Sequence, residues 1–133
     1  MSEPIEFLDL VDLVALARAL LGDPPPIRDI GLLGSAAARP QTSAFGEDAY
    51  PDLVTKAAAL LQSIVNNHAL VDGNKRLGWL ATAVFLELNG IKASRAANDD
   101  VYEFVVWIAA SNPDLDDITT RLRRVVQSGR RHG

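Results

Sequence analysis

The pattern of apolar and polar positions predicts helices along most of this 133-residue chain. In residues 10–21, apolar side chains recur every three to four positions, Asp9 can cap the helix and Gly22 can end it. A similar apolar face follows Pro51, which suits the first position of a helix that we expect to run to about Asn66. Each helix is therefore expected to pack one face against a core.

The second half of the chain predicts three more helices. Residues 76–88 are apolar on most sides, which is typical of a helix buried in the middle of a bundle, and Asn89-Gly90 ends it. Asn98 can cap a helix over residues 98–110, where the many strand-favouring residues leave a strand as the alternative. The length of this stretch and its cap favour the helix. A last helix is predicted for residues 115–127.

Residues 27–50 interrupt the helical pattern. They follow the stiff turn Gly22-Asp23-Pro24-Pro25-Pro26 and contain several glycines and small polar residues. We expect irregular structure here, with room for one short helix; long irregular stretches in small domains are often functional. Since no stretch favours an extended sheet, the fold class predicted is an all-α bundle, a single domain spanning residues 1–133.

Charge narrows the classes of partner. The formal net charge of −4 provides no basic face for nucleic acid, so we expect no direct contact with DNA or RNA. One cationic cluster stands near the C-terminal end, which we interpret as a helix end that favours cations, followed by a tail. Contact with an acidic partner is the alternative. The cluster comprises Arg121, Arg123, Arg124, Arg130 and Arg131.

Composition also bears on the compartment. The chain has no cysteine, which excludes disulfides and thiolate metal sites and suits a reducing environment. No apolar run reaches membrane-spanning length, and acidic residues interrupt the apolar ones near the start, unlike a signal peptide. We therefore expect a cytoplasmic protein with no membrane contact.

One nine-residue segment carries most of the candidate chemistry. It reads His68-Ala69-Leu70-Val71-Asp72-Gly73-Asn74-Lys75-Arg76 and lies between the two most regular predicted helices. A lone histidine at a helix end is usually solvated, Asp-Gly-Asn is a common turn, and Lys-Arg is usually a surface pair. A simple turn does not need all of them together, so their combination ahead of an apolar helix favours a functional site.

The second half of this segment is suited to binding phosphate. It leads into a helix N-terminus, where free N–H groups and the positive end of the helix dipole attract anions. Gly73 lets the backbone approach a phosphate closely, and Asn74 offers an amide donor. Lys75 and Arg76 add two positive charges. The Lys75 ammonium is a compact point charge, and the planar Arg76 guanidinium can bind two phosphate oxygens at once.

The two remaining polar residues supply other parts of a phosphoryl-transfer site. Asp72 is a hard oxygen ligand of the kind that Mg²⁺ takes when nucleotide phosphates complete its shell. His68, at the opposite end of the segment, can accept a proton near neutral pH. A base, a metal ligand and phosphate donors together indicate group transfer from a nucleotide.

At these positions the chain resembles the Doc (death-on-curing) branch of the Fic family. The general family motif is His-Pro-Phe-x-(Asp/Glu)-Gly-Asn-Gly-Arg-x-x-Arg, and the Doc form has Asn-Lys-Arg in place of Asn-Gly-Arg. His68, Asp72, Gly73 and the run Asn74-Lys75-Arg76 match the Doc form. The runs at residues 46–51 and 85–90 also look like the family, and the resemblance covers about residues 8–124.

This resemblance implies an architecture and a set of roles. The fold would be the Fic/Doc helical bundle, with a central buried helix directly after the motif loop. His68 would be the general base, Asp72 would hold Mg²⁺, and residues 73–76 would bind the phosphates of ATP. Residues 39–50 would correspond to the flap that aligns the target segment.

The resemblance also implies an activity. Doc proteins are protein kinases that transfer the γ-phosphate of ATP to a threonine of elongation factor Tu and so stop translation. They act as toxins, and an antitoxin encoded beside them restrains them. We therefore expect a cognate antitoxin and a protein substrate as partners.

Besides Lys75, which belongs to the Doc form, three residues depart from the general motif. Ala69 and Leu70 replace the usual Pro and Phe, and Trp79 stands where AMP-transferring members have a second Arg. The lost Arg and Lys75 favour phosphate transfer, with AMP transfer to a protein hydroxyl as the alternative. An inactive Fic fold that only binds partners is a third reading. Trp79, Phe85 and Trp107 are themselves expected in the core.

Overall fold

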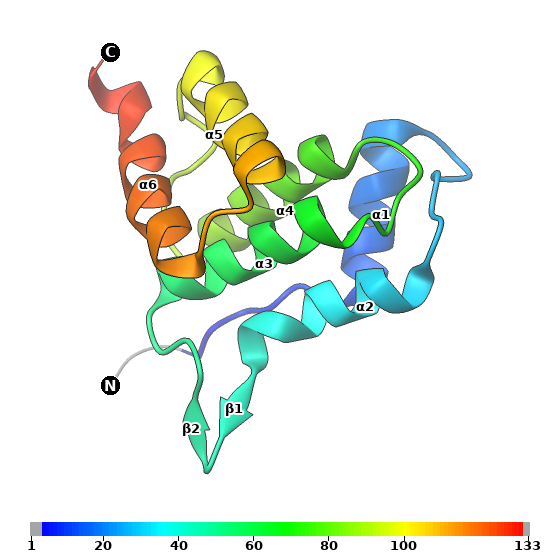
Figure 1. The fold of residues 1–133 in the computed structure, drawn as a ribbon, viewed down its shortest axis with the longest axis horizontal. Helices are drawn as coiled ribbons and strands as arrows, with labels where there is room; N and C mark the ends of the chain where they lie inside the picture. Colours follow the sequence, from blue (N-terminus) through cyan, green and yellow to red (C-terminus); the bar gives the residue numbers. More distant parts are fainter. Residues whose placement is uncertain (1–3, 132–133) are drawn as a thin grey trace.

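The computed structural model describes residues 4–131, and six α-helices make up most of this range (Figure 1). They are α1 (Leu10–Leu21), α2 (Ile30–Ala38), α3 (Leu53–Asn67), α4 (Asn74–Leu88), α5 (Asn98–Ser111) and α6 (Leu115–Gln127). Two short 3-10 helices, η1 (Arg39–Gln41) and η2 (Ser128–Arg131), and a hairpin of β1 (Ser43–Ala44) and β2 (Glu47–Asp48) complete the fold. The predicted all-α class is confirmed.

The two helices that flank the motif segment form the centre of the bundle. α3 packs along α4, with α1 and α2 against one side and α5 and α6 against the other (Figure 1). Gly78 lets α3 and α4 approach closely, since a Cβ there would lie 2.9 Å from Val65 Cγ2. The core lies between these layers and contains large side chains that are almost completely buried. Among them are Leu13, Leu60, Leu61, Ile64, Leu77, Phe85, Leu86, Phe104, Ile108, Ile118 and Leu122.

Local capping signals explain where α1 and α3 begin. Asp9 and Asp12 form a reciprocal capping box at α1, as predicted for this N-cap. The prediction that Pro51 is the first residue of α3 is wrong. Asp52 caps the helix instead, because its carboxylate accepts the Val54 N–H at 3.3 Å.

The last third of the chain is helical as predicted, with a different cap. Residues 98–111 form α5 rather than a strand. Asn98 does not cap this helix: it is the first helical residue, and Ala97 occupies the N-cap. The Ala97 N–H donates to Ser128 Oγ at 2.9 Å, so a distant side chain satisfies the start of α5.

Residues 27–50 are more regular than the sequence pattern indicates. They contain α2, η1 and the β1–β2 hairpin, in which Ser43 pairs with Asp48 and Ala44 with Glu47. α4 also begins two residues earlier than predicted, at Asn74. Phe85 is buried as expected, whereas Trp79 and Trp107 are only partly buried.

Two arginines of the cationic cluster, Arg121 and Arg123, make intramolecular contacts. The Arg121 guanidinium lies over the Trp107 ring, and Arg123 pairs with the Asp52 carboxylate. Burial acts to raise the pKa of Asp52, but hydrogen bonds from Thr55 and Val54 and the charge of Arg123 hold it below its ordinary value. The side chains of Arg130 and Arg131 lie outside the described residues.

None of the helices in residues 4–131 is both long enough and apolar enough to span a bilayer.

Candidate active site

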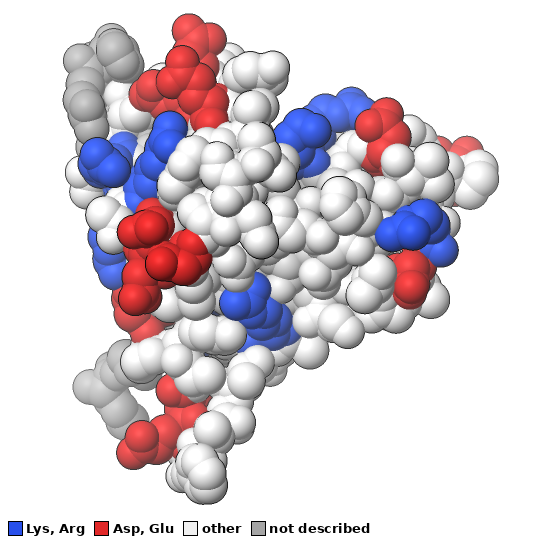
Figure 2. All heavy atoms as spheres, viewed as in Figure 1, with Lys and Arg blue, Asp and Glu red and all other residues white. Residues whose placement is uncertain are grey.

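The motif residues occupy one connection between the two central helices. α3 ends at Asn67, residues 68–73 form the motif loop, and α4 begins at Asn74. His68 and Asp72 are exposed on this loop, and Lys75 and Arg76 are exposed in the first turn of α4. In Figure 2, Lys and Arg side chains lie at this end of the molecule beside Asp and Glu, and others lie at the opposite side. The predicted site residues thus lie on one short segment, and among them His68, Asp72, Lys75 and Arg76 are exposed.

His68 has a backbone conformation that most residues avoid. With φ 55° and ψ 42° it is left-handed and serves as the C-cap of α3. Its carbonyl oxygen accepts two hydrogen bonds from the Arg28 guanidinium, one from Nε at 2.9 Å and one from Nη2. Arg28 therefore holds the predicted base in a conformation that the chain would otherwise rarely adopt.

A segment forty residues earlier in the chain supports the loop. The N–H groups of Arg28 and Asp29 both donate to Ala69 O, at 2.8 and 3.0 Å, and Val71 N donates to Pro26 O at 2.8 Å. Ile27 and Leu70 thus form an isolated antiparallel bridge. Sequence reasoning missed this segment because no local pattern connects it to the loop.

This pairing corrects the predicted position of the flap. We expected residues 39–50 to lie along the target-binding edge of the motif, but residues 26–29 are the ones hydrogen-bonded to the loop. The β1–β2 hairpin is tied instead to α3, through Lys56. In Figure 1 it projects from the end of the molecule opposite the motif loop.

Asn74 closes the loop on itself. Its Oδ1 accepts the Leu70 N–H and its Nδ2 donates to Leu70 O, both at 3.0 Å. Leu70 is 2% exposed, so its side chain is anchored in the core while its backbone is bonded to Asn74. The amide keeps one further hydrogen for another acceptor, and the predicted role of Asn74 in binding phosphate depends on that hydrogen alone.

Gly73 is required at the N-cap of α4 for two reasons. Its φ of 91° lies in the left-handed region, which favours glycine. A Cβ at this position would also lie 2.7 Å from both terminal carbons of Leu21 in α1. The residue predicted to let the backbone approach a phosphate is therefore also the point where the loop crosses α1.

The N-terminus of α4 is left without a side-chain cap. Asp9, Asp29, Asp52 and Asp114 cap α1, α2, α3 and α6 with their carboxylates, whereas Gly73 provides no such group. The first N–H groups of α4 are therefore not satisfied by the capping residue. With two cations in the same turn, this helix start can accept an anion.

Asp72 is placed to act as a single carboxylate ligand. Its Oδ1 accepts the Gly73 N–H at 2.9 Å, and because the residue is exposed, Oδ2 is available as a ligand. Within residues 4–131 no group of three His, Asp or Glu side chains could hold a metal ion by itself. The donor set thus fits Mg²⁺ only if nucleotide oxygens supply the remaining ligands.

Comparison with known proteins agrees with this geometry. The model of the Fic/DOC family matches residues 7–86, which include the whole motif loop. The chain belongs to the Fic/DOC family. It is 45% identical over 118 residues to "Toxin Doc" of Mycolicibacterium smegmatis (strain ATCC 700084 / mc(2)155), covering 88% of this chain and 91% of that protein.

An apolar groove adjoins the motif helix of this Fic/DOC domain. It has a volume of about 480 Å³, lies between α4 and α5 with Leu20 of α1 at one edge, and has Lys75 and Arg76 in its lining. The remaining lining is mostly apolar. It is formed by Trp79, Leu80, Ala83, Val101, Tyr102, Val105 and Val106, with Ser94 and Asn98.

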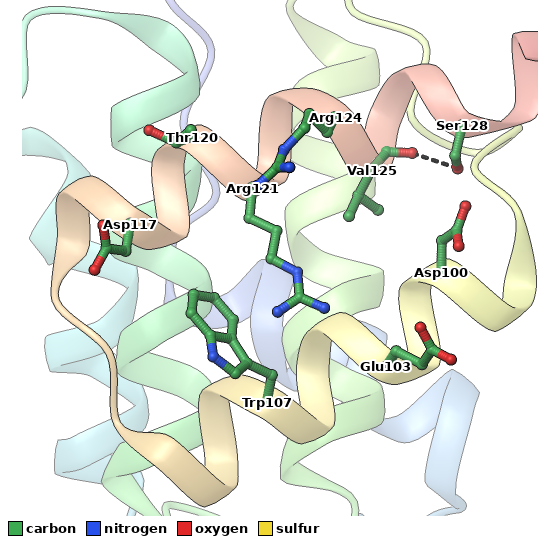
Figure 3. A pocket seen from close by; sticks show the side chains of 9 residues that line it. All are labelled: Asp100, Glu103, Trp107, Asp117, Thr120, Arg121, Arg124, Val125 and Ser128. Atoms are coloured by element: carbon green, nitrogen blue, oxygen red, sulfur yellow. Dashed lines mark hydrogen bonds between the residues drawn. The ribbon is translucent and has the colours of Figure 1, made fainter.

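A second hollow of about 480 Å³ lies between α5 and α6 of the same Fic/DOC domain (Figure 3). None of the motif residues lines it. The Arg121 guanidinium reaches over the Trp107 indole, 4.5 Å from the ring centroid, and acidic residues of α5 face the same space (Figure 3). Its separation from the motif loop distinguishes it from the candidate active site.

Proposed function

We propose that this protein is the toxin of a toxin–antitoxin pair and an ATP-dependent protein kinase of the Doc type. It would transfer the γ-phosphate of ATP to a threonine hydroxyl of a protein, with elongation factor Tu as the target. One observation carries this proposal: an uncapped helix start with Lys75 and Arg76 lies at one end of a six-residue loop, and exposed His68 lies at the other.

The chain's own groups account for each part of such a transfer. The N–H groups of the first turn of α4, with Lys75 and Arg76, bind the phosphates, and Asp72 helps to hold Mg²⁺, which offsets phosphate charge. His68 accepts the proton of the threonine hydroxyl. The hydroxyl oxygen then bonds to the γ-phosphorus, the bond from that phosphorus to the β–γ bridging oxygen breaks, and ADP leaves.

Two features support phosphate transfer over AMP transfer. Trp79 occupies the position of the second motif Arg that AMP-transferring members use to orient the nucleotide. In the structure Trp79 lines the apolar groove, where it offers no cation to a phosphate. Lys75 adds a charge at the helix start where those members have Gly.

Labelled ATP tests the proposed chemistry. Purified protein is incubated with elongation factor Tu and ATP that carries label on either the γ or the α phosphate. We expect label on the target only from the γ position, and none with His68→Ala. Label only from the α position would replace the kinase proposal by AMP transfer.

A growth assay separates an active toxin from a fold that only binds. If the chain were inactive, His68→Ala would leave its effect on growth unchanged. We expect the variant to lose growth arrest while it keeps the unfolding temperature of the wild type, because the substitution is at an exposed position.

We further propose that the cognate antitoxin covers the apolar groove between α4 and α5. Because Lys75 and Arg76 belong to both the groove and the phosphate site, a chain lying there would shield the residues that bind ATP. Tyr102→Glu is expected to weaken antitoxin binding without unfolding the protein, since Tyr102 is 68% exposed on the groove rim. Val11→Glu, at an exposed position of α1 outside the groove, is the matched control.

A further inference from the structure

The tip of the β1–β2 hairpin presents an aromatic side chain to solvent. Phe45 is fully exposed, and the hairpin projects from the helical body as a narrow arm (Figures 1 and 2). Phe45 and Gly46 form a two-residue loop with φ values of 55° and 79°, the signature of a type I′ turn. Such turns prefer Asn at the first position, so a bulky Phe in the left-handed region is conformationally strained there.

The arm is held firmly rather than loosely tethered. Lys56 of α3 is 1% exposed, and its Nζ binds Asp48 Oδ2 at 3.1 Å and the carbonyl of Tyr50. Arg39 donates to the Tyr50 hydroxyl at 3.2 Å and also to Ala59 O and Ser63 Oγ on α3. A buried lysine and an arginine thus fix both ends of the hairpin. A hairpin whose base is already fixed loses less backbone conformational entropy when its tip binds than a mobile loop does.

We propose that this hairpin is an exosite, a docking point apart from the reaction site, that binds the folded protein substrate through Phe45. The proposal rests on the proposed function, since it takes a protein as the acceptor. Lys56 lies on α3 and His68 is the C-cap of the same helix, twelve residues later. This separation is about 18 Å along the helix at 1.5 Å per residue. The tip lies still farther away (Figure 1), so a folded protein, and not a short acceptor peptide, can contact both places.

The size of the contact favours a substrate over a permanent partner. One Phe buries about 150–250 Å², whereas a stable interface buries about 1,200 Å² or more in total. A brief contact suits a substrate that must leave after each turnover. Charge disfavours a second copy of this chain, because exposed Glu47 and Asp48 beside the tip would face the same acidic residues. The fitting partner has an apolar pocket with a basic rim.

Three variants test the exosite. Phe45→Asn removes the aromatic group and creates the Asn-Gly pair that this turn prefers, so the fold should be kept or stabilised. Phe45→Trp keeps a large apolar group at the tip. Val11→Gln removes an exposed apolar side chain elsewhere, at a position 74% exposed on α1. The readout is steady-state phosphorylation of purified elongation factor Tu, together with the dose of toxin needed to arrest growth.

We expect Phe45→Asn to raise KM for the protein substrate by about tenfold or more, with kcat at saturation within about twofold of wild type. Phe45→Trp and Val11→Gln should match the wild type. An unchanged KM in Phe45→Asn overturns the exosite. If Phe45→Asn turned a dimer into a monomer, the occupant of the tip would be a second copy of this chain. If it lost antitoxin binding at unchanged KM, the occupant would be the antitoxin. Either result overturns the exosite.

The growth assay keeps this test separate from the proposed target. If the wild type does not phosphorylate elongation factor Tu, the proposed function is wrong and the exosite is judged by growth arrest. Loss of arrest by Phe45→Asn, with arrest kept by Phe45→Trp and Val11→Gln, then supports docking of another protein. Arrest by Phe45→Asn at the wild-type dose overturns it.

Discussion

Replacing Arg28 by Ala should impair catalysis more than folding. Both Nε and Nη2 of Arg28 donate to the carbonyl of His68, whose backbone is left-handed at φ 55°. Arg28 is itself exposed, so its removal opens no cavity in the core. What is lost is the constraint that keeps the predicted base in one conformation.

The size of the effect follows from the bonds removed. A hydrogen bond that involves a charged group stabilises by about 1.5–3 kcal/mol net, and exposure of Arg28 places this one at the low end, about 1–2 kcal/mol. The left-handed conformation costs a non-glycine residue about 1–2 kcal/mol, so the unclamped loop should often leave it. At about 1.4 kcal/mol per factor of ten, kcat should fall about 5- to 30-fold.

Single-turnover transfer from γ-labelled ATP measures this loss directly, with the unfolding temperature followed in parallel. Arg28→Lys should give an intermediate rate, because it keeps the charge but loses the two-pronged contact. Arg18→Ala is the control: Arg18 forms only a surface ion pair with Asp23 at 3.4 Å. A wild-type rate in Arg28→Ala would refute the idea that this clamp positions His68.

Three further predictions concern stability. Gly73→Ala should destabilise by about 2 kcal/mol or more in chemical denaturation and weaken ATP binding, because the left-handed φ of 91° and the Leu21 contact at 2.7 Å both penalise a Cβ. Lys56→Met should cost about 1–3 kcal/mol and speed proteolysis of the hairpin, since it leaves the Tyr50 carbonyl without its donor. Asp52→Asn should lower the free energy of unfolding at neutral pH by up to about 1 kcal/mol, seen as a lower melting temperature. The pKa of Asp52 is lowered in the folded protein, so this difference should be present above pH 3.8 and vanish as the pH falls through the folded value; a constant difference would contradict it.

The motif loop could be predicted because its signals are local. The polar residues of the loop are contiguous in the sequence, and Gly73 marks a start of α4 that lacks a side-chain cap. Arg28 could not be found in this way, since forty residues separate it from His68 and only the fold brings them together. The wrong cap positions have the same cause. Ser128 satisfies the start of α5 from the far end of the chain, which no pattern near Asn98 indicates.

The hairpin escaped prediction for a different reason. Its turn pair, Phe45-Gly46, is not one of the pairs that favour a type I′ turn, and each strand has only two residues. Lys56 is a charged residue of α3, and it is nevertheless buried, because Asp48 and the Tyr50 carbonyl satisfy its charge. A long-range ion pair thus stabilises structure that local propensity does not favour.

Two of the departures from the general family motif, Ala69 and Leu70, lie within the motif loop. Pro and Phe would stiffen and anchor a loop from within, and this chain has Ala69 and Leu70 in their place. Leu70 is nevertheless 2% exposed, its N–H and C=O are both bonded to Asn74, and Ala69 O accepts two N–H groups from residues 28 and 29. Contacts from α4 and from the segment before α2 therefore supply the rigidity that the missing proline and phenylalanine would otherwise provide. A degenerate motif would be expected to lose such supporting contacts along with its sequence, so their presence here supports the proposal that the loop is a phosphate site.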